Sequence, residues 1–167
     1  MKIHIQQLDN TYSDQLIDLI LTIQQKEFNV PITIEDQPDL KQIESFYMEP
    51  GGNFWGAFID GELVGSIALV KFDEGVGAVR KMFVKKEFRG KELNIAQELL
   101  EVLVSFCQEN GIDSIYLGTV TILKAVIRFY ERNHFVEVEK ENLPAFFPLM
   151  SADNVFYYLN LKQNHTV

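Results

Sequence analysis

Apolar and polar residues of this chain alternate with two periods, one typical of strands and one typical of helices. A period of two, or a short apolar run bounded by turn residues, predicts a strand. The strands predicted in this way are residues 2–8, 53–60, 62–72, 76–84, 114–118, 135–139 and 154–161. Asp60-Gly61 and Asp73-Glu74-Gly75 have the composition of hairpin turns. The strands on either side of these turns are therefore expected to pair antiparallel.

Apolar positions with a period near 3.6 predict four helices. The first has its apolar face at Leu16, Leu19, Ile20 and Ile23. Thr11 or Ser13 is expected to cap this helix, because a hydroxyl accepts from free N–H groups of the first turn. A second, short helix is expected at 39–48. The third ends at Asn110-Gly111, a typical C-cap, and the fourth includes residues 123–130.

The order of these elements is β-α-α-β-β-β-α-β-α-β-β, which implies a mixed sheet with helices on both faces. A chain of 167 residues is most simply one domain and is long enough to bury a core. Its 47% apolar content, with 13 Phe and 6 Tyr, argues against disorder. We therefore expect a single α/β domain over residues 1–167.

Charge and special residues exclude several classes of protein. The net charge of −9 argues against general binding of nucleic acid or of an anionic membrane. No apolar run approaches a membrane span and no signal-peptide core is seen, so we expect a cytoplasmic location. Cys107, the single cysteine, lies in a helical apolar pattern and is expected to be a buried structural thiol. The three histidines are scattered, so no metal site is expected.

A basic loop precedes the third helix and stands out against the acidic background. Its four cations are Lys85, Lys86, Arg89 and Lys91. N–H groups at a helix start have no partners within the helix, and the helix dipole makes that end positive. Such a turn beside Lys and Arg binds phosphate well. Either a phosphorylated ligand, such as a cofactor, binds this loop, or the four cations form only a solvated surface.

This loop resembles a motif of the GCN5-related N-acetyltransferase (GNAT) superfamily. The family's signature is Gln/Arg-x-x-Gly-x-Gly/Ala, which opens a helix after the fourth strand. The matching residues here are Lys91-Glu92-Leu93-Asn94-Ile95-Ala96. Lys91 replaces Arg and Asn94 replaces the first Gly, and Asn visits left-handed conformations more readily than most residues. Arg89-Gly90 also matches the Arg-Gly that often leads into the family's loop.

A second segment, 126–135, resembles the family's Ala-x-x-x-Tyr-Glu-x-x-Gly-Phe helix and strand start. Val126 stands at the Ala position and His134 replaces Gly, which makes His134 a candidate turn residue. Many family members carry an Asn that contacts the cofactor three residues before that Ala, where this chain has Leu123. The resemblance extends from the first strand to the last. It implies a GNAT fold with a mixed, mostly antiparallel sheet splayed between its fourth and fifth strands.

The resemblance further implies that acetyl-CoA, the acetyl donor, binds where the strands ending near Val84 and Gly118 splay apart. The backbone of 82–84 would bind the pantetheine arm like an added strand, and the amides of 91–96 would hold the pyrophosphate. Arg89 and Lys91 would add charge-assisted contacts. The implied cofactor-binding residues are Met82, Phe83, Val84, Arg89, Gly90, Lys91, Glu92, Leu93, Asn94, Ile95, Ala96 and Tyr130.

The implied reaction is direct transfer of the acetyl group to a primary amine of a small molecule or peptide. A backbone N–H near Phe83 or Val84 would polarise the thioester carbonyl. Tyr130 matches the family's tyrosine near the coenzyme sulfur and is the candidate general acid. The alternative is that Tyr130 belongs to the core, because it shares an apolar stripe with Leu123 and Ile127.

The general base and the acceptor stay open. Many relatives carry a Glu where this chain has Ala78, and the possible substitutes are Asp73, Glu74, Glu44 or a chain of waters. The missing Glu also favours an alternative, a non-catalytic CoA-binding sensor or protein-interaction module. The acidic charge favours a cationic acceptor, whereas an apolar pocket, or only core, would use Phe46, Tyr47, Trp55, Phe146 and Phe147. The aromatic final strand is a candidate for pairing in a homodimer.

Overall fold

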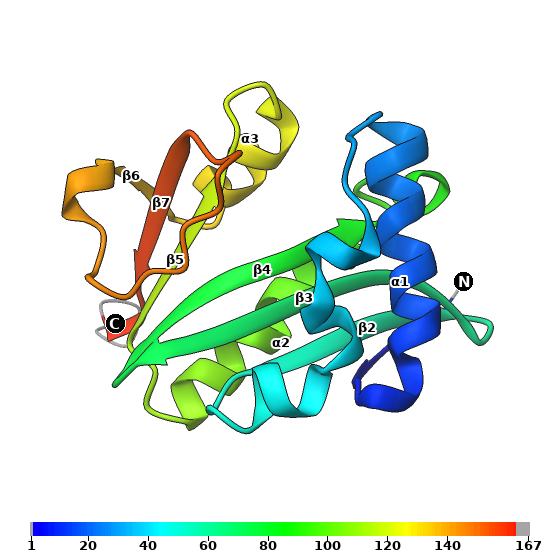
Figure 1. Cartoon of the computed structure of the whole chain (residues 1–167), viewed down its shortest axis with the longest axis horizontal. Coiled ribbons are helices and arrows are strands. Elements are labelled where there is room, and N and C mark those ends of the chain that lie inside the picture. The colour runs from blue at the N-terminus through cyan, green and yellow to red at the C-terminus, as the bar shows by residue number, and fades with distance from the viewer. Residues whose placement is uncertain (1, 163–167) are drawn as a thin grey trace. The chain divides into compact units, whose positions relative to one another are not determined.

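The computed structural model describes residues 2–162, and seven strands form one mixed sheet in the order β1-β2-β3-β4-β5-β7-β6 (Figure 1). The strands are β1 (Ile3–Gln7), β2 (Asn53–Ile59), β3 (Glu62–Asp73), β4 (Val76–Val84), β5 (Ser114–Thr119), β6 (Val136–Val138) and β7 (Val155–Asn160). The α-helices of the described chain are α1 (Ser13–Leu21), α2 (Ile95–Glu109) and α3 (Lys124–Arg132). Each strand ends within one residue of its predicted bounds, so the predicted mixed α/β fold is confirmed.

Short 3₁₀ and π helices lie between these elements. They are η1 (Asn10–Tyr12), η2 (Thr22–Glu27), η3 (Ile34–Asp36), η4 (Pro38–Lys41), η5 (Ile43–Met48), η6 (Lys86–Phe88) and η7 (Lys140–Asn142). The single helix predicted at 39–48 is wrong, because Gln42 has φ −134° and ψ 46° and separates η4 from η5. The N–H of Gln42 donates to Asp39 O and closes η4 as a 3₁₀ turn, and the non-helical backbone of Gln42 ends that turn before η5 begins.

The predicted cap of the first helix is also wrong. Tyr12 occupies the N-cap position of α1 and makes no capping hydrogen bond with its side chain. Asp9 instead caps the preceding turn η1, where its carboxylate accepts hydrogen bonds from the N–H (3.0 Å) and the hydroxyl of Thr11. Ser13 opens α1 without capping it, and its buried hydroxyl has no hydrogen-bond partner among the described residues. Asp9 suits the start of η1, because its carboxylate accepts a hydrogen bond from a free N–H group of that turn.

The chain divides into two compact units, and the first comprises Met1–Val70 and Arg80–Phe106. In this unit, β2 pairs antiparallel with both β1 and β3. Helices lie on both faces of these strands, with α1 and η3–η5 in front and α2 behind (Figure 1). Alternate residues of β2 divide between the faces: Phe54 joins the core cluster with α1, and Trp55 packs its ring against Phe106 of α2. The predicted helices on both faces of the sheet are therefore observed in this unit.

Gly52 connects η5 to β2 at a point of close backbone approach. A Cβ atom at this position would lie 2.0 Å from the carbonyl oxygen of Leu69 and 2.9 Å from that of Tyr47. Because both neighbours are backbone atoms, only glycine fits without displacing the chain. This contact holds the end of η5 against β3, and with it the aromatic residue Tyr47.

The second unit comprises Lys71–Val79 and Cys107–Val167. The first residues of β4 pair in parallel with β5, from Val76–Ser114 to Ala78–Tyr116. The strand β7 pairs antiparallel with β5 and with β6. β7 is thus an inner strand within the described chain, with β5 along one edge and β6 against Phe156–Tyr158 of the other. The expectation that the final strand is a free edge for pairing is wrong, and the homodimer itself stays a prediction. The splaying of β4 and β5 beyond their paired residues stays a prediction.

A left-handed residue ends α3 in this unit. His134 has φ 73°, and the N–H of Phe135 donates to Tyr130 O at 3.1 Å. This geometry turns the chain from the helix into β6 and places His134 where the related motif has glycine. The expectation that His134 is a turn residue is confirmed.

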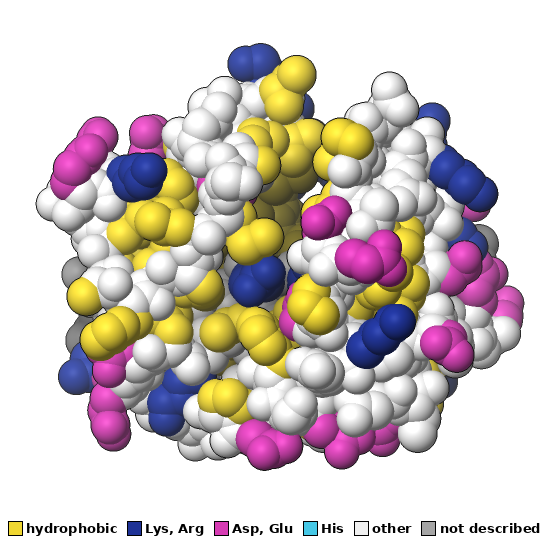
Figure 2. Space-filling model, viewed as in Figure 1, with side chains coloured by type: hydrophobic (Ala, Val, Ile, Leu, Met, Phe, Trp, Pro, Cys, Tyr) yellow, Lys and Arg dark blue, Asp and Glu magenta, His cyan; other side chains and the backbone are white. Residues whose placement is uncertain are grey.

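Acidic side chains are scattered over the face of the molecule shown in Figure 2, in keeping with the net charge of −9. No helix of residues 2–162 is long and apolar enough to cross a membrane. Within the same residues, no three His, Cys, Asp or Glu side chains come together in a way that would hold a metal ion.

Candidate functional site

The loop between β4 and α2 lies in the first unit and contains two residues with positive φ. Gly90 has φ 122° and Asn94 has φ 57°. The N–H of Asn94 donates to Gly90 O at 3.1 Å, and the N–H of Glu98 donates to Asn94 O, so α2 begins at Ile95. Asn94 thus adopts the left-handed conformation at the position where the related motif carries glycine.

The backbone amides of this loop are available to a ligand. Within the described residues, no hydrogen-bond acceptor is found for the N–H groups of Lys91, Glu92, Leu93, Ile95 and Ala96. The last two belong to the first turn of α2, where the helix dipole is positive. Several unpaired N–H groups at a helix start bind a phosphate group well. The residues of the loop therefore fit the pyrophosphate of a coenzyme.

Asn94 offers a direct test of this geometry. We expect Asn94→Ala to lower the free energy of unfolding by about 1–2 kcal/mol, because a Cβ without a polar group disfavours the left-handed conformation. Asn94→Gly is expected to match the wild type or exceed it slightly, because glycine adopts positive φ freely. Urea unfolding measures both effects, with Glu92→Ala as an exposed control in the same loop. Equal stability of the Ala and Gly variants would contradict the assigned conformation.

Arg89 is held by protein groups on three sides. Its Nε donates to Val84 O at 2.7 Å, and its two terminal nitrogens form a bidentate ion pair with Glu27, the last residue of η2. The guanidinium carbon lies 5.8 Å from the centre of the Phe28 ring. Arg89 therefore ties the loop to η2, and its predicted contact with a phosphate competes with the carboxylate of Glu27.

The other cations of the loop differ in their partners. Lys85 pairs with Glu62 of β3, and its N–H donates to Val64 O at 2.8 Å. Lys91 is exposed and makes no ion pair with any residue in 2–162. Arg89 and Lys91 are the two basic residues predicted to contact phosphate. Arg89 is already paired with Glu27, whereas the charge of Lys91 is not paired within residues 2–162. The partners Glu27 and Glu62 carry no local signal in the sequence, because they come from elements far from the loop.

β4 contains an irregularity just before the residues predicted to bind the pantetheine arm. Lys81 has φ 56°, and the Ser66 hydroxyl donates to Lys81 O at 2.7 Å. A left-handed residue inside a strand is typical of a bulge, which interrupts the ladder and redirects the residues that follow. Those residues are Met82, Phe83 and Val84, all half-buried in the first unit.

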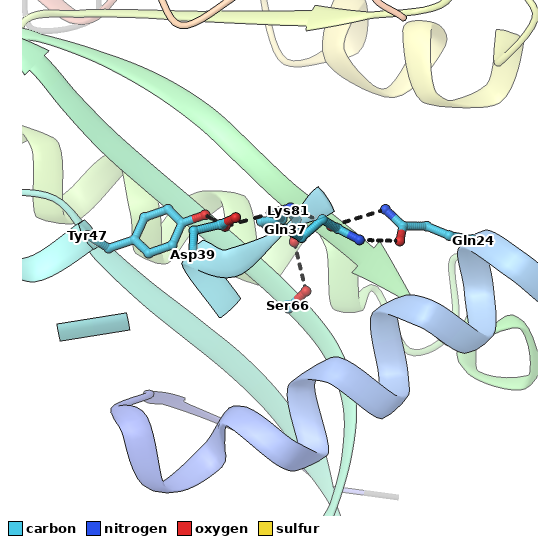
Figure 3. Close-up of polar contacts among 6 residues, drawn as sticks. All are labelled: Gln24, Gln37, Asp39, Tyr47, Ser66 and Lys81. Carbon is cyan, nitrogen blue, oxygen red and sulfur yellow. Dashed lines mark hydrogen bonds and ion pairs between the residues drawn. The ribbon is translucent and has the colours of Figure 1, made fainter. Parts of the chain in front are cut away.

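A buried polar network surrounds the Lys81 side chain (Figure 3). Its Nζ donates to Gln37 Oε1 at 2.6 Å and lies 3.7 Å from Asp39 Oδ2. The Tyr47 hydroxyl donates to the same carboxylate oxygen at 2.5 Å, and Gln37 Nε2 donates to Gln24 Oε1 at 2.8 Å. The side chains of Lys81 and Asp39 are each 7% exposed. Four segments of the first unit, η2, the residues 37–39, η5 and β4, thus contribute to the network around this ion pair, which no sequence pattern indicated.

The network shifts the ionisation of its members. Burial lowers the pKa of Lys81 to about 8; Asp39 opposes this change, and the charge of Arg80 adds to it. Burial also raises the pKa of Tyr47 above its ordinary value, and the negative charge of Asp39 adds to that increase. At neutral pH the lysine is therefore charged but close to losing its proton, while Tyr47 stays neutral.

Tyr130 lies in the second unit and is 4% exposed. Its ring packs edge-on against Phe129 and Phe135, at centroid distances of 5.3 and 5.1 Å. Burial raises the pKa of Tyr130, so the hydroxyl keeps its proton at neutral pH. This hydroxyl makes no hydrogen bond with a described residue. Both interpretations, core residue and proton donor to a ligand, are compatible with this position.

The three carboxylates considered for the general base all lie on the surface. Ala78 is buried, Asp73 is the exposed last residue of β3, and Glu74 is exposed in the turn before β4. Glu44 is exposed and accepts a hydrogen bond from the N–H of Asn10. None of these three carboxylates belongs to the buried network, and the identity of the base stays open.

The aromatic residues considered for an acceptor pocket divide into core and surface. Tyr47, Trp55 and Phe147 are buried, whereas Phe46 and Phe146 are exposed, the latter by 69%. The core interpretation therefore holds for the first three. Of these, Tyr47 combines a core position with the hydrogen bond to Asp39.

The chain matches known proteins over most of its length. The model of the Acetyltransferase (GNAT) family matches residues 17–135. A GNAT-family acetyltransferase from Staphylococcus aureus Mu50 has a TM-score of 0.91 and 42% identity, with 96% of this chain and 99% of that chain covered. An acetyltransferase from Streptococcus agalactiae has a TM-score of 0.90 and 28% identity, over 95% and 98% of the two chains. The fold is thus that of an acetyltransferase.

The curated relatives match over a smaller share of this chain and of their own length. N-acetylaspartate synthetase of Xenopus tropicalis is 36% identical over 102 residues, which cover 60% of this chain and 37% of that protein. The probable N-acetyltransferase camello of the same species is 28% identical over 72% of this chain and 55% of its own length. The chain therefore spans about a third to a half of these curated relatives. With a family model matched over more than half of its residues, the chain belongs to the GNAT acetyltransferase family.

Proposed function

We propose that this N-acetyltransferase moves an acetyl group from acetyl-CoA directly to the primary amine of a small molecule or a peptide. The observation that carries the proposal is the set of unpaired amides of 91–93, Ile95 and Ala96, which lie on either side of left-handed Asn94. GNAT homologues bind coenzyme A, as in the complex of PaiA N-acetyltransferase from Thermoplasma acidophilum, which shares this fold. The loop has the N–H groups that the pyrophosphate of this coenzyme requires.

In this proposal the chain supplies binding, polarisation and a proton. When bound, acetyl-CoA supplies a thioester carbonyl carbon that an amine nitrogen can attack. The amides of 91–96 hold the pyrophosphate, and the backbone of Met82–Val84 positions the pantetheine arm. An N–H of Phe83 or Val84 polarises the carbonyl. The protonated hydroxyl of Tyr130 donates to the departing thiolate.

A second candidate is a non-catalytic CoA-binding sensor or interaction module. Ala78 favours it, because the position of the usual carboxylate carries no titratable group. Leu123 favours it as well, because it replaces an amide that contacts the cofactor in many relatives. Both candidates predict coenzyme binding, and only the first predicts turnover.

Calorimetry with CoA and release of the coenzyme thiol across a panel of amines distinguish these candidates. The panel contains polyamines, an aminoglycoside, lysine-containing peptides and amino acids. Aspartate belongs in the panel because one curated relative is an N-acetylaspartate synthetase. We expect CoA to bind and at least one amine to accelerate thiol release. Binding without turnover on any amine would favour the sensor, and absence of binding would refute both candidates.

A further inference from the structure

The ammonium group of Lys81 has fewer partners than a buried cation requires. It can donate three hydrogen bonds, yet a single one, to Gln37 Oε1, joins it to a described residue. Asp39 lies at 3.7 Å, which is an ion-pair distance but too long for a hydrogen bond. The Tyr47 hydroxyl already donates to the same oxygen of Asp39. The buried ammonium of Lys81 therefore has N–H groups that no residue of the network accepts from.

The charges around Lys81 favour a further anion. Asp39 is the carboxylate whose field acts on this ammonium, while the adjacent Arg80 adds a second positive charge. A buried ion is costly unless it is both paired and hydrogen-bonded. The pKa of Lys81 stays below the ordinary lysine value despite Asp39, so the partners of the ammonium do not fully offset its burial. A carboxylate from a ligand would complete it.

The backbone places this cation beside the proposed reaction centre. Lys81 directly precedes Met82–Val84, the segment proposed to hold the arm that ends in the thioester. Its left-handed backbone is fixed by the bond from Ser66, and Gln37 and Asp39 fix its side chain. A lysine whose backbone and ammonium group are both held in place can bind a substrate group with a defined geometry.

We propose that Lys81 binds a carboxylate of the acceptor, so that the substrate is an amino acid or a similar small molecule with both a primary amine and a carboxylate. This inference rests on the proposed function and names the class of its acceptor. Lys81 then determines specificity: its ammonium donates to the carboxylate, and the amine is left to attack the thioester. Asp39 and Gln37 are positioning residues that hold the ammonium in place.

Matched pairs of acceptors that differ in the carboxylate test the proposal. Leucine is compared with leucinamide, and alanine with alaninamide, by kcat/KM for thiol release. We expect the wild-type protein to prefer the member with the free carboxylate by about tenfold or more, as for a charged hydrogen bond. In each pair, the ammonium group of the amide has a lower pKa than that of the amino acid. The amine of the amide is therefore more often neutral at the assay pH. Amine ionisation therefore works against the expected preference and cannot imitate it.

Variants separate recognition from other roles of Lys81. Lys81→Met is expected to abolish the preference, whereas Lys41→Met, an exposed lysine of η4, is expected to keep it. A proton-accepting role would slow all acceptors equally and preserve the ratio, which would overturn the proposal. A wild-type ratio near one or favouring the amide would overturn it as well. Because the wild-type ratio needs no substitution, a variant that fails to fold does not block the test.

Side-chain NMR of Lys81 supplies a readout that does not depend on turnover. Leucine is expected to raise the pKa of Lys81, because a bound carboxylate stabilises the ammonium, and leucinamide is expected to leave it unchanged. If no acceptor supports thiol release but leucine still shifts this pKa, the proposed function fails and carboxylate binding stands. If leucine and leucinamide act alike, carboxylate binding is refuted whether or not turnover is seen.

Discussion

Asp39→Ala is expected to lower the free energy of unfolding by about 3–5 kcal/mol, the usual cost of removing one partner of a buried ion pair. The substitution leaves the ammonium of Lys81 with its hydrogen bond to Gln37 but without a neighbouring carboxylate. It also removes the acceptor of the Tyr47 hydroxyl, which is fully buried. Without the negative charge, the pKa of Lys81 falls further, and part of the cost is met by loss of its proton.

A double variant distinguishes the ion pair from a simple loss of packing. In Asp39→Asn with Lys81→Met the two charges disappear together, and the amide can still accept from Tyr47. We expect most of the stability to return, because a buried ion pair contributes little relative to an uncharged pair of similar size. Urea unfolding measures all variants, with Glu35→Ala as an exposed acidic control expected to change stability by less than about 0.5 kcal/mol. A single Asp39 variant as stable as this control would contradict the described network.

Tyr130→Phe is expected to slow release of the coenzyme thiol by about a hundredfold or more, the usual contribution of a general acid. The substitution removes one oxygen and keeps the ring between Phe129 and Phe135. Because the hydroxyl makes no hydrogen bond with a described residue, folding and CoA affinity should change little. Thiol release and calorimetry on the same preparation measure the two effects.

Tyr158→Phe provides the matched control for this prediction. Tyr158 lies on β7 in the same unit, is half-buried and packs against Tyr116. Its variant is expected to turn over at the wild-type rate. Equal rates for the Tyr130 and Tyr158 variants would assign Tyr130 to the core and return the search for the proton donor to other groups or to water.

The strands were predictable because their information is local. Alternating side chains and turns such as Asp60-Gly61 limit each strand from its own residues. The helix predicted at 39–48 failed for the opposite reason. The segment does have a helical period. However, Asp39 pairs with Lys81 of β4 and accepts a hydrogen bond from Tyr47, and the backbone leaves the helical conformation at Gln42 between them. Tertiary contacts overrule local preference at such positions.

The same distinction applies to the site. The loop was recognisable from its spacing, and Asn94 proved able to take the left-handed conformation of a glycine. The ion pairs of the loop could not be predicted from its own residues, because the partner of Arg89 is Glu27, which lies 62 residues away in the sequence. Lys81 and Gln37 are 44 residues apart. A buried lysine in a strand looks like any surface cation until the fold brings its neighbours together.

Cys107, the one cysteine of the chain, is fully buried in α2, and burial raises its pKa to about 12. At neutral pH this side chain is almost entirely in the thiol form, which does not attack disulfide reagents. A chromogenic disulfide dye added to the native protein will therefore report the free sulfhydryl of the coenzyme against a negligible background. The protein needs no cysteine substitution before its turnover can be followed continuously.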